Sequence, residues 1–445
     1  MASKLTRADR AIVRLADGTV KQQNLLTGTE VWTVPGRGNR PLTAPHADRN
    51  PIDHEADGHH CAFCAGRYLE TPPEKSRLVR HEDGSWEQLD ALGADQLTDT
   101  VAEFRRIPNL FEILSNEYWQ ENYGYVPPEH IDEQRRAYLA SPAGRAHVLS
   151  VARAKLRAAG RTPEQIAGYD EDEIIASASG FFGSGHDVIV ARRHFCDGAE
   201  NTSQLASSGT LTPEEHYYYT AFTVESARQL YETNRYAPYV AVFQNWLKPA
   251  GASFDHLHKQ LVAIDERGVQ NELAIQRVRA NLNVFNEDGV NYASRHNLLL
   301  AENDHAVAYA GFGHRYPTIE IYSKSERAWP WEHSIEEVGG VSDLVHAMHA
   351  ATGADVPCNE EWHHRPVDCD VPMPWRVLLK WRVSTVAGFE GGTKIYINTI
   401  DPMGIRDRVV PRLKALRDQG RIGGMRLGEE CSGKPNLLRY NPVLR

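Results

Sequence analysis

The sequence has few cysteines, no long hydrophobic run and no excess of basic residues. Its 445 residues include six cysteines, which are too few for a disulfide framework and suit a reducing compartment. No segment approaches the run of about 18 uncharged apolar residues that a transmembrane helix requires, and residues 1–14 lack the apolar core of a secretory signal. We therefore predict a cytoplasmic protein that does not span a membrane.

The charge balance also limits the kinds of partner. The formal net charge at pH 7 is −10, whereas a general nucleic-acid surface needs clustered lysines and arginines. Residues 406–445 are locally basic, but a solvated helix face explains this more simply than a binding patch does. We predict no nucleic-acid partner and an ordinary globular protein, long enough for two domains.

Apolar patterns predict two successive units with a related order of elements. Each unit contains a helix, at residues 213–233 in the first and around residues 335–352 in the second. Strands are predicted at residues 187–191, 239–243 and 257–264 of the first unit, and at residues 306–310, 318–321, 375–383 and 394–400 of the second. Residues 116–177 are rich in helix formers and few β-branched runs interrupt them, so we predict a helical insertion there.

One predicted strand carries the residues most suited to chemistry. The run at residues 254–262 looks like a strand, and side chains alternate along a strand, so His256, His258 and Gln260 would project together. Two imidazoles and an amide on one side can hold a metal, or one imidazole can attack phosphorus while the amide donates to a phosphoryl oxygen. The pattern alone fits hydrogen-bonded histidines without chemistry equally well.

A second group of candidate ligands lies apart in the sequence. Cys61 and Cys64 have the spacing with which two thiolates reach one zinc ion, but they supply only half of a tetrahedral site. A redox pair and two plain structural cysteines are the alternatives. His194, just beyond the predicted strand at residues 187–191, can reach a metal at a sheet edge, although alone it is more simply a surface histidine.

Several motifs, in order along most of the chain, resemble those of the galactose-1-phosphate uridylyltransferases, the transferase branch of the histidine-triad superfamily. They are Asn-Leu-Leu-Thr-Gly at 24–28 with the Gly- and Arg-rich loop 34–41, Cys-Ala-Phe-Cys at 61–64, residues 107–111 and 186–194, and Gln-Asn, Gly-Ala-Ser and His-Leu-His-Lys-Gln at 244–245, 251–253 and 256–260. The resemblance implies an α+β fold of two histidine-triad-like halves, residues 1–285 and 286–445. Each half would have a mainly antiparallel sheet with packed helices, and the first would carry the insertion at about 116–177.

The resemblance also implies roles for individual residues. His258 would be the nucleophile, with Gln260 beside it. One structural zinc ion per chain would be bound by Cys61, Cys64, His194 and His256. The nucleotide and its phosphates would be contacted by Arg37, Arg40, Asn109, Asn245 and Ser253, and the sugar hydroxyls by Glu390.

The implied reaction is transfer of a nucleotide between a nucleotide sugar and a sugar 1-phosphate, through a nucleotidyl-His258 intermediate with ping-pong kinetics. Gln260 resembles the transferase branch, because the hydrolytic branch has a third histidine there. One alternative is a phosphorylase of ADP-sugars or dinucleoside tetraphosphates that uses inorganic phosphate as acceptor. Another is a nucleotide-binding protein without catalysis. The family also implies a homodimer in which the partner subunit helps to complete each sugar site.

The match weakens in the second half of the chain. His363 occupies the position of a ligand to a second metal in some family members, but the partner ligands would fall at Leu378 and Lys380, which cannot serve. We predict no second metal. Phe254 and Lys259 replace residues common around the active histidines, so the natural acceptor need not be galactose 1-phosphate.

Overall fold

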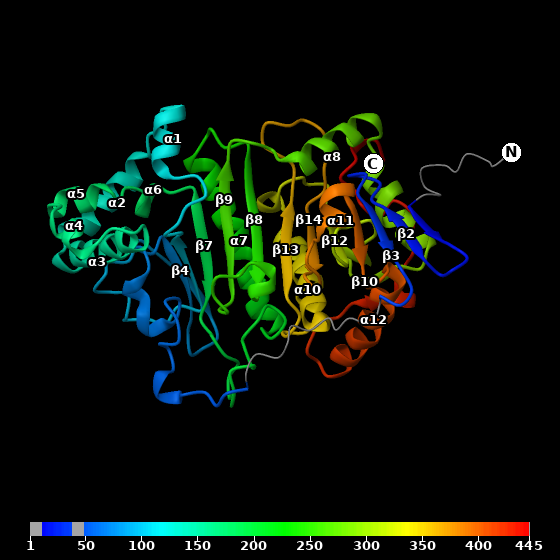
Figure 1. Cartoon of the computed structure of the whole chain (residues 1–445), viewed down its shortest axis with the longest axis horizontal. Coiled ribbons are helices and arrows are strands. Elements are labelled where there is room, and N and C mark those ends of the chain that lie inside the picture. The colour runs from blue at the N-terminus through cyan, green and yellow to red at the C-terminus, as the bar shows by residue number, and fades with distance from the viewer. Residues whose placement is uncertain (1–10, 38–48, 445) are drawn as a thin grey trace.

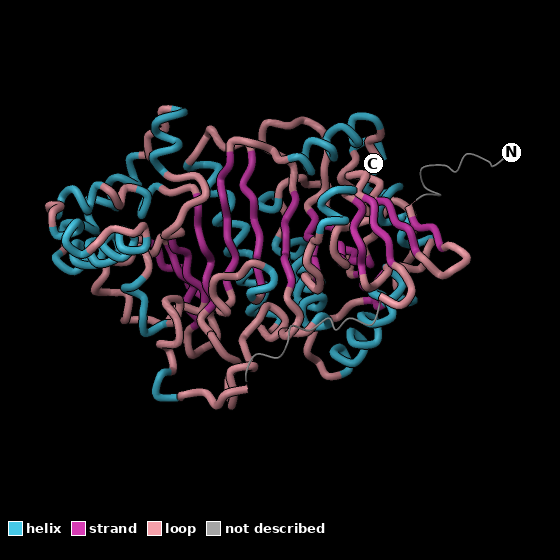
Figure 2. Tube along the Cα trace, viewed as in Figure 1, coloured by secondary structure: helices cyan, strands magenta, loops and turns pink. Residues whose placement is uncertain are grey.

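The computed structural model of the chain describes residues 11–37 and 49–444, so that Arg40 lies outside the described residues. Over these ranges, twelve strands form one antiparallel sheet in the order β16-β10-β11-β12-β14-β13-β8-β9-β7-β6-β4-β5 (Figure 2). The first half of the chain contributes β4 (Ser76–Arg80), β5 (Trp86–Asp90), β6 (Phe104–Pro108), β7 (His186–Ala191), β8 (Tyr239–Trp246) and β9 (His258–Ile264). The second half contributes β10 (Leu299–Glu302), β11 (Ala306–Ala310), β12 (Thr318–Ser323), β13 (Cys358–His363), β14 (Arg376–Trp381) and β16 (Arg426–Leu427).

The strand order repeats outward from the centre of the sheet. The two halves meet where β8 pairs with β13. On its other side, β8 pairs with β9, the next strand in the first half, and β13 pairs with β14, the next strand in the second half. Beyond these lie β7 and β12, the strands that precede each central helix. The prediction of an α+β fold with two related halves is confirmed. The boundary at residue 285 stays a prediction, because the sheet runs through both halves without a break.

Two long helices, α7 (Pro213–Thr233) and α10 (Ile335–Thr352), cover one face of the sheet (Figure 1). Capping boxes start both helices: Thr212 and Glu215 exchange hydrogen bonds at the first, and Ser334 and Glu337 do so at the second. Lys259 of β9 reaches toward α7, with its Nζ 4.7 Å from the centre of the Tyr219 ring. Its sequence neighbours His258 and Gln260 therefore face the opposite, helix-free side.

The predicted helical insertion is also present. It consists of α1 (Asn116–Tyr123), α2 (Glu129–Ala140), α3 (Pro142–Ala158), α4 (Pro163–Ala167), α5 (Glu171–Ala176) and α6 (Gly180–Gly183). These helices gather at one end of the molecule around a core of their own, which includes Val148, Ile174 and Phe181 (Figure 1). None of the described helices combines the length and hydrophobicity that crossing a bilayer requires.

A small second sheet lies at the opposite end of the molecule (Figure 1). It contains β1 (Ile12–Arg14), β2 (Val20–Gln23), β3 (Glu30–Thr33) and β15 (Ile395–Asn398), and β3 pairs with β15 in parallel. The helices α8 (Val269–Ala280), α9 (Asn291–Arg295), α11 (Gly388–Thr393) and α12 (Pro402–Asp418) complete the second half and its connections. The small sheet thus joins the two ends of the sequence.

Candidate functional site

A group of two cysteines and two histidines lies at the end of β7 and before β9. The ligand atoms of Cys61, Cys64, His194 and His256 all lie within 4.8 Å of one another. The two Sγ atoms are 3.8 Å apart, and His256 Nδ1 is 3.3 Å from Sγ of Cys61 and 3.7 Å from Sγ of Cys64. Ligand atoms of a tetrahedral zinc site with ordinary bond lengths lie about 3.5–3.8 Å apart. The group therefore fits a metal ion such as zinc.

Hydrogen bonding fixes the tautomer of His256 for this role. Its Nε2 donates to the carbonyl oxygen of Ala191 at 2.6 Å, which leaves the Nδ1 lone pair facing the two cysteines. The hydrogen bond from Cys61 lowers the pKa of the Cys64 thiol most, and the imidazoles of His194 and His256 lower it further. Cys64 is thus prepared to act as a thiolate ligand.

His258 has the opposite arrangement. Its Nδ1 donates to the carbonyl oxygen of His256 at 2.7 Å, which leaves Nε2 without a proton. Burial lowers the pKa of His258 to about 4, so the ring is neutral near pH 7. The sequence pattern predicted His256 within the strand, but this residue lies just before β9. The two imidazoles therefore serve different sites: His256 faces the cysteines and His258 faces a pocket.

This pocket, hereafter the His258 pocket, has a volume of about 480 Å³. It brings together four of the predicted site residues, namely His258, Gln260, Asn109 and Ser253. Its walls are largely apolar, with Phe63 and Phe254 next to His258 and with Ile107, Pro108 and Leu110 near the end of β6. Such a slot, apolar with a few convergent polar groups, suits a small ligand with a planar ring.

His186 also lines the His258 pocket, and it determines how Gln260 points. The backbone N–H of Ile113 donates to His186 Nδ1 at 3.1 Å, so the ring proton of this neutral imidazole is on Nε2. That nitrogen lies 3.1 Å from Oε1 of Gln260 and donates to it, while Asn109 Nδ2 lies 3.4 Å from the same oxygen. The amide nitrogen of Gln260 is left to face the pocket. This role was not predicted from the sequence, although His186 stands directly before a predicted strand.

Three other predicted site residues lie elsewhere in the fold. Asn245, on β8, lines a different pocket between β8 and β13. Arg37 follows β3 of the small sheet, and Glu390 lies in α11, which leads into β15 of that sheet. Figure 1 shows the small sheet at one end of the molecule, apart from β9, which carries His258. Arg37 and Glu390 thus both lie in segments next to the small sheet and not on the strand of His258.

The position expected for a second metal contains a salt bridge. Lys380 Nζ lies 2.6 Å from Oε2 of Glu361, and His363 Nε2 lies 3.7 Å from the same oxygen. Burial alone would raise the pKa of Glu361, but the Lys380 ammonium and His363 lower it to about 2. His363 is not part of the one ligand group found among the described residues.

Comparisons with known proteins identify the family of the chain and proteins that are similar to it. A family model described as a domain of unknown function, DUF4921, matches residues 15–440. The chain belongs to the DUF4921 family. A curated ADP-glucose phosphorylase of Arabidopsis thaliana is 29% identical over 176 residues, which cover 37% of this chain and 49% of that protein. The match thus spans about half the length of this relative.

Two solved structures share the fold of this DUF4921 protein. One is the crystal structure of an ADP-glucose phosphorylase from Arabidopsis thaliana with bound ADP-glucose, with a TM-score of 0.55 and 19% identity over 89% of this chain and 98% of that chain. The other is a GalT-like protein from the same plant, with a TM-score of 0.53 and 19% identity over 88% of this chain and 98% of that chain. The predicted resemblance to the galactose-1-phosphate uridylyltransferases is confirmed at the level of the fold.

Proposed function

We propose that this protein is a nucleotidyltransferase that splits a nucleoside diphosphate sugar with inorganic phosphate, and that His258 carries the nucleotide between the two steps. One observation carries the proposal. The His258 pocket contains both a neutral imidazole whose Nε2 has no proton, that of His258, and the side-chain amide of Gln260. The sequence favoured a sugar 1-phosphate as the acceptor. The curated relative and one of the two solved structures are described as ADP-glucose phosphorylases, which favours inorganic phosphate as the acceptor and makes ADP-glucose the first donor to test.

The chemistry follows from these groups. Nε2 of His258 attacks the α-phosphorus, a P–N bond forms, and the P–O bond to the sugar phosphate breaks, which releases a sugar 1-phosphate. An oxygen of inorganic phosphate then attacks the same phosphorus, and the P–N electron pair returns to His258. The acceptor keeps its proton, and the product is a nucleoside diphosphate. The Gln260 amide and the Ser253 hydroxyl would donate to the non-bridging oxygens, where loss of one donor costs about 100- to 1,000-fold in rate.

The base would occupy the apolar part of the His258 pocket, beside Asn109. We further propose that the cysteine and histidine group binds one zinc ion, which would act as a structural link that holds the segment before β9 against residues 61–64. No chemical step is assigned to the metal. Since His256 precedes His258 by two residues, this link would also fix the position of the His258 ring above the sheet.

Arg37 and Glu390 support a dimer in which each copy completes the site of the other. Arg37 follows β3 and Glu390 lies in the helix before β15, so both adjoin the small sheet, which lies apart from β9 within one chain. A second copy can bring them to the His258 pocket, where Arg37 would contact phosphate and Glu390 the sugar, together with Arg40. Light scattering tests this directly: a monomer at working concentration would contradict it.

The test of the reaction is a labelling experiment. Protein incubated with ADP-glucose labelled at the α-phosphorus should become labelled on His258 and release glucose 1-phosphate. Later addition of inorganic phosphate should discharge the label as ADP, whereas glucose 1-phosphate should return ADP-glucose. His258→Asn should abolish labelling, and His81→Asn, which alters an exposed histidine, should not. Absence of label with ADP-, UDP- and GDP-sugars alike would contradict the proposal.

A further inference from the structure

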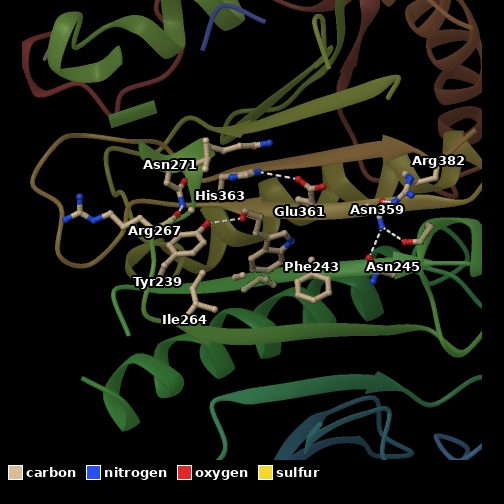
Figure 3. Close-up of a pocket in the computed structure, with 17 residues that line it drawn as sticks. Tyr239, Phe243, Asn245, Ile264, Arg267, Asn271, Asn359, Glu361, His363 and Arg382 are labelled. Carbon is tan, nitrogen blue, oxygen red and sulfur yellow. Dashed lines mark hydrogen bonds and ion pairs between the residues drawn. The ribbon is translucent and has the colours of Figure 1, made fainter. Parts of the chain in front are cut away.

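A pocket between β8 and β13 has a volume of about 610 Å³, more than the His258 pocket. It is lined by the helix-free faces of both strands and by the start of α8 (Figure 3). Phe243 of β8 lines it, and Phe243 pairs across the strands with Gln260, which lines the His258 pocket. The two pockets therefore lie on the same face of the sheet, one strand apart.

A chain of hydrogen bonds at one end of this pocket finishes in a donor (Figure 3). Arg382 Nη1 donates to Oδ1 of Asn359 at 2.7 Å, and Asn359 Nδ2 donates to Oδ1 of Asn245 at 2.7 Å. The side-chain oxygens of Asn359 and Asn245 therefore each already accept a hydrogen bond. The amide nitrogen of Asn245 comes last, and no acceptor for it is present among the residues that the structure describes. A ligand that accepts hydrogen bonds would complete this chain.

The same end carries a positive charge without a counter-ion. Arg382 has no carboxylate partner within the described ranges, its Nε is buried without a hydrogen bond, and its guanidinium lies 4.6 Å from the centre of the Tyr316 ring. The other charges of the pocket are balanced. Arg267 is paired with Asp368 at 2.8 Å, and Glu361 is paired with Lys380 at 2.6 Å. A guanidinium beside donor amides is suited to an oxyanion, and to phosphate in particular.

The position of Asn245 relates this end of the pocket to the reaction. The paired segment of β8 and β9 ends at Phe243 and Gln260. Asn245 follows Phe243 by two residues and His258 precedes Gln260 by two residues, so both lie at the same end of these neighbouring strands. We infer that the Arg382, Asn359 and Asn245 end of this pocket binds the phosphate of the second substrate, next to the nucleotide in the His258 pocket. Its catalytic meaning rests on the proposed function.

One subsite serves both halves of the reaction. In a double displacement, the first step releases the phosphate of the sugar 1-phosphate, and in the second step inorganic phosphate attacks. Each of these phosphates lies on the side of the transferred phosphorus that faces away from His258, so both occupy the same place. The pocket beyond Phe243, bordered by Tyr239 and Ile264, is larger than inorganic phosphate requires. It therefore has room for the sugar of the released sugar 1-phosphate. On this inference the second half of the chain supplies Asn359 and Arg382 to the reaction.

Calorimetric titration of the full-length protein tests binding without turnover. Inorganic phosphate and glucose 1-phosphate should each bind at least about tenfold more weakly to Arg382→Gln than to the wild type, whereas AMP should bind both equally. Arg267→Gln is the matched control, because it removes an arginine of the same pocket that Asp368 already engages, and phosphate binding should stay within about twofold. Equal binding of phosphate to the wild type and to Arg382→Gln would overturn the inference.

A second variant covers the case in which Arg382→Gln does not fold. Asn245→Asp keeps Arg382 and Asn359 but ends the chain in a carboxylate, and it should weaken phosphate binding by at least the same factor; unchanged binding would again overturn the inference. In turnover, Arg382→Gln should raise the KM for phosphate at least about tenfold. If wild-type protein never becomes labelled on His258, the proposed function fails, while the titrations still decide whether phosphate binds at Arg382.

Discussion

His186 holds the side-chain oxygen of Gln260 by a hydrogen bond from Nε2 at 3.1 Å. Nδ1 of the same ring accepts the backbone N–H of Ile113, which puts the ring proton on Nε2 and directs it to the oxygen of Gln260, so that the amide nitrogen of Gln260 is turned away from His186. A glutamine that must donate to a phosphoryl oxygen would otherwise be free to turn its oxygen toward that anion. His186 is therefore a positioning residue that acts through Gln260.

The first prediction concerns this pair. His186→Phe should lower kcat about 10- to 100-fold, less than the loss of the Gln260 donor itself. The double variant His186→Phe with Gln260→Ala should be no slower than Gln260→Ala alone, because the histidine acts only through the glutamine. Steady-state rates with ADP-glucose and phosphate measure this. Multiplicative effects of the two substitutions would show that His186 has a separate role.

The second prediction concerns the metal. Freshly purified protein should contain about one zinc ion per chain, and Cys64→Ser should contain less than half of that, with a Tm lower by several degrees, because metal binding stabilises only the folded chain. Cys196 lies outside the ligand group, so Cys196→Ser should keep both the zinc and the Tm. Elemental analysis and thermal unfolding give the two values. Full zinc content in Cys64→Ser would reject the ligand assignment.

The third prediction concerns a buried ion pair behind the reactive strand. Lys259 Nζ lies 2.5 Å from Oε1 of Glu360, and both side chains are fully buried between the sheet and the two long helices. Burial would raise the pKa of Glu360, but the charge of Lys259 and a hydrogen bond with His349 lower it. Lys259→Met should therefore destabilise the fold by about 3–5 kcal/mol, because it removes the lysine counter-ion of a buried carboxylate.

The control for this pair is the double variant Lys259→Met with Glu360→Gln, which removes both charges and should recover most of the loss. Urea unfolding gives the free energies of all three proteins. If the double variant is as unstable as Lys259→Met alone, packing of the lysine stem rather than charge is responsible.

The fourth prediction is a pH dependence at Glu361. The folded chain holds the pKa of this carboxyl at about 2, below its ordinary value of 4.5. The carboxylate therefore stabilises the fold fully above pH 4.5, and this contribution is lost as the pH falls from 4.5 toward 2. The difference in unfolding free energy between the wild type and Glu361→Gln should be constant from pH 5.5 to pH 8 and shrink below pH 4.5. A difference that grows on acidification would contradict the assignment.

The sequence predicted best those parts of the fold that carry local signals. The helix predicted at residues 213–233 has the observed bounds of α7, because Thr212, Pro213 and Glu215 form a capping box and a proline start. The run at residues 254–262 was predicted to be a strand, and alternation along it placed His256 beside His258. Instead β9 begins at His258, and the chain before it directs the two rings to different sites.

Relationships between distant segments could not be predicted from local pattern. Arg37 and Glu390 were assigned to the nucleotide and the sugar through resemblance, but their common place on the small sheet depends on the parallel pairing of β3 with β15, across more than half of the chain. The role of His186 depends on the register between β7 and β9, which sets it close to Gln260. The large pocket arises only where the two halves meet, so no single motif marks Arg382.

Because β8 pairs with β13, the strands of the two halves form one continuous sheet. The strands at the centre of the sheet are protected by neighbours on both sides, and the unpaired edges belong to β5 and β16, far from the reactive strand. Amide hydrogens of β8, β9 and β13 should therefore exchange with solvent only when the whole sheet opens, long after those of the edges and of the insertion. The most slowly exchanging part of the molecule would then be the strand that presents His258.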